Sequence, residues 1–187
     1  AGFAQAAGTR LRHVKPHGAL YNMAARDAAL AEAIARAVHD FDPALILFGL
    51  AGSELPRAGE RAGLAVAHEG FADRHYERDG SLTPRAQPGA VIDDVDAAIE
   101  QAIAIAMRGT IATRDGGTLS LHADTSCVHG DRRDAANFAR RLRKALDAAS
   151  VRVESRHAET DQPWGKSHRN GRSPMNYWPL LGVAVVV

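Results

Sequence analysis

The chain has 187 residues, of which 45% are hydrophobic and 24% charged, and its formal net charge is only +1. This composition is typical of a globular domain with a real core, and the near-zero charge gives no electrostatic footprint for nucleic acid. The apolar run at 183–187 is far shorter than the roughly 20 residues that a membrane-spanning helix needs. We therefore expect a cytoplasmic protein that binds neither nucleic acid nor membranes, in keeping with a single cysteine, Cys127.

The first half of the chain alternates helical and strand-like segments. Apolar residues recur at helical spacing after Asp27, and an almost unbroken apolar run at 44–50 is typical of a strand covered on both faces. Gly8 and Gly63 can end helices, because glycine readily adopts the left-handed conformation found there. Helices are therefore expected at 2–7, 27–41 and 53–62, and strands at 11–14, 44–50 and 64–67.

The second half continues this alternation after a long polar loop at 75–89. The glycines of Arg114-Asp115-Gly116-Gly117 favour a tight turn and therefore a hairpin between the segments on either side. The remaining expected elements are a helix that begins at Asp94, a strand at 124–128 and a helix at 133–148.

Alternation of strands and helices favours a parallel sheet or barrel with right-handed crossovers. We expect this α/β domain to occupy residues 1–153. Residues 154–187 show no sustained period and are expected to form an irregular carboxy-terminal extension.

Three polar patches each follow a strand-like run: Lys15-Pro16-His17-Gly18, Glu69-Gly70-Phe71-Ala72-Asp73-Arg74 and Cys127-Val128-His129-Gly130-Asp131. In α/β folds the carboxyl ends of parallel strands gather reactive groups around one cavity. We therefore expect the three patches to meet in a shared site, and the chain to be part of an enzyme.

The first patch offers a cation and an imidazole. Lys15 and His17 alternate along an extended segment, so both can point to the same side. Lys15 can balance the charge of a phosphate or carboxylate, and His17 can transfer protons near neutral pH. The alternative is a turn with two exposed polar residues.

The second patch places two carboxylates and a guanidinium within six residues. Glu69 and Asp73 can activate water or hold a metal ion, and Arg74 can bind a substrate carboxylate through its paired donors. The alternative is a structural ion pair in which Arg74 neutralises Asp73.

The third patch offers His129 and Asp131, which are close enough for Asp131 to orient the imidazole or for both to ligate one cation. A solitary His-x-Asp also matches many loops by chance. Cys127 lies inside the apolar run and is expected to be a small core residue rather than a nucleophile. The sequence has no His-Glu-x-x-His, Walker or dinucleotide-binding glycine motif, so a common type of zinc hydrolase is not supported.

Four segments together resemble the LamB/YcsF family in order and spacing, from about Gly2 to Val153. They are the three polar patches, the first of them extended to Asn22, and Arg85 with Pro88-Gly89-Ala90-Val91-Ile92. The resemblance implies a partial (β/α) barrel of the glycoside hydrolase and deacetylase type. The family's amino-terminal acidic motifs are absent, so the barrel is expected to lack its first strands. His75 is a smaller departure, since arginine is expected there.

The resemblance also implies an activity. Members of the family act as one component, called A, of bacterial 5-oxoprolinase, which also has B and C subunits and opens 5-oxoproline to glutamate with ATP as co-substrate. It implies catalytic residues among His17, Glu69, Asp73, His129 and Asp131, and substrate-binding residues Lys15, Arg74 and Arg85, with the metal requirement left open. The alternatives are a non-catalytic scaffolding subunit or inactive fragment, and a carbohydrate deacetylase-like hydrolase.

Overall fold

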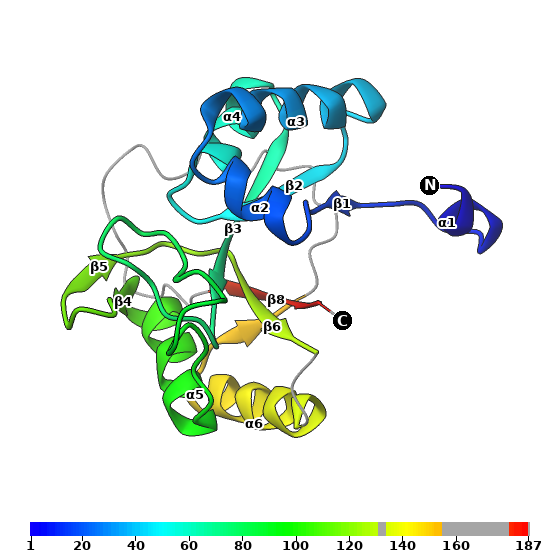
Figure 1. Cartoon of the computed structure of the whole chain (residues 1–187). Coiled ribbons are helices and arrows are strands. Elements are labelled where there is room, and N and C mark those ends of the chain that lie inside the picture. Colours follow the sequence, from blue (N-terminus) through cyan, green and yellow to red (C-terminus); the bar gives the residue numbers. More distant parts are fainter. Residues whose placement is uncertain (131–133, 155–179, 187) are drawn as a thin grey trace, which may run out of the picture.

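A computed structural model describes residues 1–130, 134–154 and 180–186. Its main element is a six-stranded sheet in the order β1-β2-β3-β6-β8-β7, in which every neighbouring pair is parallel. The sheet curls into a half-barrel (Figure 1). Its strands are β1 (His13–Val14), β2 (Ile46–Leu50), β3 (Ala65–Phe71), β6 (Thr125–His129), β7 (Arg152–Val153) and β8 (Leu180–Val186).

Helices cover the sheet in two groups, with α3 and α4 beside β2 and β3, and α5 and α6 beside β6 (Figure 1). A small antiparallel hairpin, β4 (Thr110–Ala112) with β5 (Thr118–Ser120), lies outside the main sheet. The helices are α1 (Gly2–Ala6), α2 (Ala19–Ala24), α3 (Ala28–Phe41), α4 (Glu54–Arg61), α5 (Val95–Ile103), which continues as a π-helical turn at Ala104–Arg108, and α6 (Ala135–Ala148).

Aspartates begin two of these helices as the sequence predicts. The carboxylate of Asp27 accepts a hydrogen bond from the N–H of Leu30, and that of Asp94 accepts one from the N–H of Ala97. A side-chain oxygen at this position satisfies an amide that the first helical turn leaves without a partner. These caps fix where α3 and α5 begin and therefore how each packs on the sheet.

Strand alternation separates a helix-covered face from a second face that carries polar groups. Leu47 belongs to the core under α3 and α4, and Val128 to the core under α5 and α6. Because successive side chains point to opposite faces, Glu69, Phe71 and Cys127 lie on the other face. The functional argument concerns this inner face of the half-barrel.

The structure confirms the α/β class and the partial barrel, and three of its differences from the predicted elements bear on the site and on the sheet. β3 continues to Phe71, so Glu69 lies within the strand instead of after it. A short helix, α2, follows Gly18 where only a turn was expected.

The third difference concerns the carboxy-terminal extension. Residues 180–186 form β8, which pairs with β6 and β7, so the expectation of an irregular extension is wrong for this segment. Its run of valines has high β propensity, and an open sheet edge offers it unpaired backbone groups. The rest of the predicted extension after residue 154 lies outside the described residues. Within the described ranges, no helix is both long enough and apolar enough to cross a membrane.

Candidate functional site

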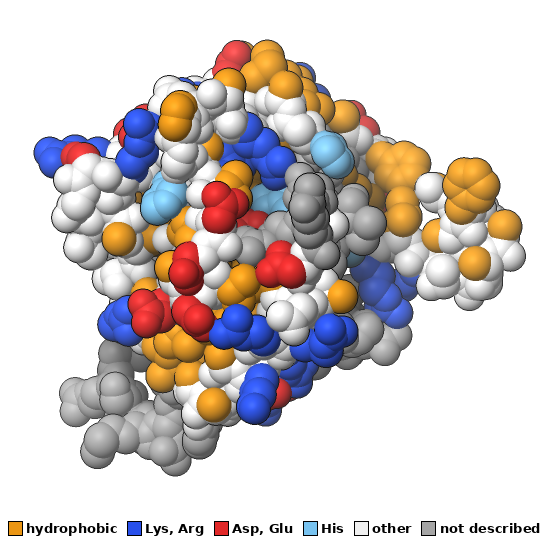
Figure 2. Space-filling model, turned by 60° about the horizontal axis from the view of Figure 1, so that its bottom comes forward, with side chains coloured by type: hydrophobic (Ala, Val, Ile, Leu, Met, Phe, Trp, Pro, Cys, Tyr) orange, Lys and Arg blue, Asp and Glu red, His pale blue; other side chains and the backbone are white. Residues whose placement is uncertain are grey.

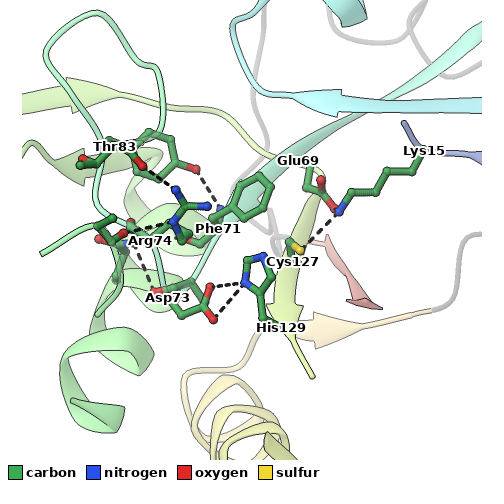
Figure 3. Close-up of polar contacts among 12 residues, drawn as sticks. Lys15, Glu69, Phe71, Asp73, Arg74, Thr83, Cys127 and His129 are labelled. Carbon is green, nitrogen blue, oxygen red and sulfur yellow. Dashed lines mark hydrogen bonds and ion pairs between the residues drawn. The ribbon is translucent and has the colours of Figure 1, made fainter. Parts of the chain in front are cut away.

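Side chains from three strands converge on the inner face of the half-barrel (Figure 3). β3 supplies Glu69 and Phe71, β6 supplies Cys127 and His129, and Lys15 follows directly after β1. The parallel register places Phe71 opposite Cys127, and Asp73 lies two residues beyond the end of β3. Residues up to 112 positions apart in the sequence are thereby in contact.

Glu69 is a buried carboxylate with two donors. Lys15 Nζ lies 2.8 Å from Glu69 Oε1, and the phenol of Tyr21 donates to Glu69 Oε2 at 2.8 Å. The side chain of Glu69 is 0% exposed while that of Lys15 keeps 18%. Burial, and then the charge of Glu69, raise the pKa of Tyr21 well above its ordinary value, so the phenol keeps the proton that it donates.

Cys127 lies against the same lysine, with its Sγ 3.3 Å from Lys15 Nζ. Burial, followed by the charge of Glu69, raises the pKa of the thiol to about 12. At neutral pH the side chain is therefore an uncharged thiol in the core. Because only the thiolate is strongly nucleophilic, this thiol is a poor nucleophile. The geometry favours the packing role that the sequence predicts.

His129 and Asp73 form a second polar unit. His129 Nδ1 lies 3.0 and 3.1 Å from the two carboxylate oxygens of Asp73, which is 1% exposed. The ring of His129 stacks on Phe71 with centroids 5.8 Å apart and planes 28° apart. An imidazole that donates from Nδ1 to a carboxylate has Nε2 available to accept a proton. No described residue forms a hydrogen bond with Nε2.

Phe71 joins the two polar units. Lys15 Nζ lies 5.4 Å from the centre of its ring, and the ring of Tyr21 meets it edge-on at 5.7 Å. A cation over an aromatic face is attracted by the ring's quadrupole. The cation of Lys15 and the imidazole of His129 therefore flank one aromatic side chain, as a shared site requires.

Arg74 lies apart from this cluster. Its guanidinium donates to the carbonyls of Thr83 at 2.5 Å and Ala90 at 3.1 Å, and the side chain is buried. Burial, followed by the charge of Arg85, lowers the pKa of Arg74. The carboxylate of Asp73 forms its hydrogen bonds with His129 instead. Arg74 therefore anchors the loop after β3, and its predicted role toward substrate stays a prediction.

The other predicted site residues lie away from the cluster or outside the described ranges. His17 is exposed, and among the described residues it makes no hydrogen bond or ion pair with Lys15 or Glu69. Arg85 lies on the exposed part of the loop. Asp131 is outside the described residues. Their predicted roles stay predictions.

Two polar residues of the inner face were not predicted. Tyr21 could have been found once α2 was recognised, because that helix follows Lys15 and turns its buried face inward. Thr125 lies opposite Glu69 in the β3–β6 register, and its buried hydroxyl has no hydrogen-bond partner among the described residues. Strand alternation from Cys127 places Thr125 on the same face.

Acidic and histidine side chains gather at the centre of one face of the molecule, with Lys and Arg around them (Figure 2). Within the ranges that the structure describes, however, no three His, Cys, Asp or Glu side chains are grouped closely enough to hold a metal ion. We therefore assign no metal ligand among these residues.

The sequence model of the LamB/YcsF family matches residues 1–161. The chain belongs to the LamB/YcsF family. The match confirms the resemblance carried by the polar patches, which are the segments that build the inner-face cluster.

Relatives in this family carry consistent names. The chain is 60% identical over 153 residues to the A subunit of 5-oxoprolinase from Methylococcus capsulatus, covering 82% of this chain and 59% of the relative. It is 55% identical over 152 residues to the corresponding 5-oxoprolinase component of Bacillus subtilis, covering 81% and 59%. The chain thus spans about three fifths of the length of these relatives.

A solved structure has the same fold. The lactam utilization protein from Thermus thermophilus superimposes with a TM-score of 0.74 at 43% sequence identity, over 82% of this chain and 61% of that protein. The matched part of this chain therefore has the same fold as part of a solved relative.

Proposed function

We propose that this chain acts as the A component of a 5-oxoprolinase, opening the lactam of 5-oxo-L-proline to give L-glutamate, together with B and C subunits and with ATP as co-substrate. Two relatives that are 55% and 60% identical carry the name of this component, and a solved relative is named for lactam utilization. The observation that carries the proposal is the pair formed by His129 Nδ1 and both carboxylate oxygens of buried Asp73.

The reaction needs help at two points. A five-membered lactam is a poor acyl donor, and phosphorylation of its amide oxygen by ATP would create a leaving group at the carbonyl carbon. Water then adds its oxygen to that carbon, and the C–N bond breaks as the nitrogen takes up a proton, which leaves an acyl phosphate. A second water displaces the phosphate, so that the lactam, ATP and two waters give glutamate, ADP and inorganic phosphate. In this proposal His129 Nε2 accepts the proton of the attacking water and later returns it to the leaving nitrogen.

The inner face supplies the remaining groups. Asp73 holds the imidazole in one tautomer and stabilises the imidazolium formed when the water is deprotonated. Lys15 supplies a positive charge for an anionic group such as the substrate carboxylate, while Glu69 and Tyr21 fix the position of that ammonium. The stacked ring of Phe71 limits rotation of His129.

The test is glutamate formation from 5-oxoproline by the chain assembled with B and C subunits and ATP. Asp73→Asn and His129→Gln should each lower kcat by about 10²–10⁴-fold with little change in KM, since they remove general acid–base catalysis. Asp96→Asn, on the exposed part of α5, is the matched control and should leave kcat unchanged.

Three outcomes would count against the proposal. Unchanged kcat in both variants would show that the pair takes no part in the reaction. Assembly with the partners but no turnover by the unmodified chain would support the scaffolding alternative. Release of acetate from acetylated sugars, without lactam opening, would support the deacetylase alternative.

A further inference from the structure

Strand β3 ends at Phe71, two residues before Asp73, whose carboxylate contacts His129. β3 pairs with β6 only as far as Phe71, yet Asp73 is 1% exposed. Backbone carbonyls in a buried segment need hydrogen-bond donors, and those beyond a strand end must find them outside the sheet. The position of the Asp73 carboxylate therefore depends on which donors hold this segment.

Gln101 of α5 supplies two N–H donors to this segment through one side chain, and three carbonyl oxygens share them. Its Nε2 lies 2.8 Å from the carbonyl oxygen of Phe71, 3.2 Å from that of Ala72 and 2.8 Å from that of Arg74. These carbonyls flank Asp73 on both sides. The carbonyl of Asp73 itself accepts a hydrogen bond from a backbone N–H in the returning loop, that of Ile92, at 2.9 Å.

The helix that carries Gln101 is firmly packed. Ala98, Ile99 and Ala102 of α5 are buried in the same apolar cluster as Ala72. At the start of the segment, the N–H of Phe71 donates to the phenol of Tyr76 at 2.9 Å. Gln101 thus connects a rigid helix to the one stretch of backbone that sets the direction of Asp73.

We propose that Gln101 is a positioning residue for the Asp73–His129 pair. By holding the carbonyls on both sides of Asp73, it fixes the backbone so that both carboxylate oxygens face His129 Nδ1. The amide of Gln101 binds this backbone and acts on His129 only through Asp73. The consequence for catalysis rests on the proposed function, whereas the geometric role does not.

The geometric role is tested on the full chain by NMR. The Nδ1–H of His129 should give a low-field proton resonance, identified by its loss in His129→Gln. Gln101→Met keeps the length of the side chain but removes the amide donors, and should abolish or strongly shift this resonance. Glu100→Gln, at the exposed neighbouring position of α5, is the matched control and should leave it in place. An unchanged resonance in Gln101→Met would overturn the proposal.

A measurement on the unmodified chain keeps the proposal testable if Gln101→Met does not fold. The side-chain amide protons of Gln101 should exchange with solvent more slowly than those of exposed Gln5. Exchange as fast as that of Gln5 would show that the amide does not hold the three carbonyls, and would overturn the proposal.

The catalytic consequence is tested in the assembled enzyme. Gln101→Met should lower kcat by about 10- to 100-fold with little change in KM, because displacement of a catalytic group by about 1 Å costs this much. Unchanged kcat, in an enzyme that Asp73→Asn inactivates, would overturn it. If the unmodified chain opens no lactam but Gln101→Met still loses the resonance, the positioning role holds and the proposed function fails.

Discussion

At the scale of single residues, the ion pair between Lys15 and Glu69 places a fully buried carboxylate beside an ammonium. Glu69 is fully buried, and its two oxygens are held by an ammonium and a phenol. A buried charge costs several kcal/mol of desolvation, which its partner offsets only while the pair is intact. Removing one partner is therefore expected to lower the free energy of unfolding far more than replacing both partners.

Lys15→Met should lower the free energy of unfolding by about 3–5 kcal/mol, because it leaves the carboxylate of Glu69 buried without a counter-charge. The double variant Lys15→Met/Glu69→Gln should recover more than half of that loss. Urea denaturation of both variants measures the difference. Arg57→Met, which breaks the exposed pair with Glu54, is the control and should cost less than about 1 kcal/mol.

A loss in Lys15→Met no larger than in the Arg57 control would contradict this account. It would mean that water reaches Glu69 when the ammonium is absent. The double variant distinguishes this case, because it would then be no more stable than Lys15→Met.

At the scale of elements, α4 lies so close to the sheet that it has no room for a side chain at Gly59. A Cβ added there would lie 2.7 Å from Val66 Cγ1 and 3.0 Å from Leu47 Cδ2. Both neighbours belong to strands of the sheet centre, where pairing with adjacent strands restricts their movement. Glycine at this helical position is therefore a packing requirement.

Gly59→Ala should destabilise the chain even though alanine is the better helix former by about 1 kcal/mol. Overpacking of a core costs about 1–3 kcal/mol, which exceeds or cancels that gain. Thermal unfolding followed by circular dichroism measures the effect. Gly2→Ala in α1 has nothing within 4 Å of its added Cβ and should not destabilise the chain. A rise in Tm for Gly59→Ala would show that α4 can move away from the sheet at little cost.

The sequence predicts most elements because local signals mark them. The carboxylate of Asp27 caps α3, and the apolar run at 44–50 becomes the buried strand β2. The short helix α2 gives no such signal, because it has only six residues and no side-chain cap. β8 was missed for a different reason: its pairing with β6 is a long-range contact that no local pattern specifies.

At the scale of the whole molecule, the parallel sheet brings residues of all three polar patches together, as expected, although Glu69 and His129 lie within strands rather than after them. The sequence could not specify which side chains pair. Asp73 was weighed as a partner of Arg74, but its carboxylate faces His129 and the guanidinium of Arg74 holds loop carbonyls. These choices depend on strand register and on the path of the loop after β3, neither of which is encoded in a short motif.

Burial at the centre of this assembly also links global stability to pH through Cys127. The pKa of its thiol is raised from an ordinary value of 9.0 to about 12, first by burial and then by the charge of Glu69. Between these values the unfolded chain has lost the thiol proton while the folded chain retains it. The unfolded state then binds fewer protons, so the free energy of unfolding falls as pH rises, by up to about 1.4 kcal/mol per pH unit.

From pH 8 to pH 10, the free energy of unfolding should therefore fall by about 1.4 kcal/mol more in the unmodified chain than in Cys127→Ala. Urea denaturation at the two pH values measures both falls. Tyr21, whose raised pKa acts in the same direction, is present in both proteins and cancels in the comparison. The cavity left by alanine lowers stability equally at both pH values. Equal falls in the two proteins would show that the folded thiol ionises as readily as the unfolded one, and that the interior around Lys15 and Glu69 admits a second negative charge.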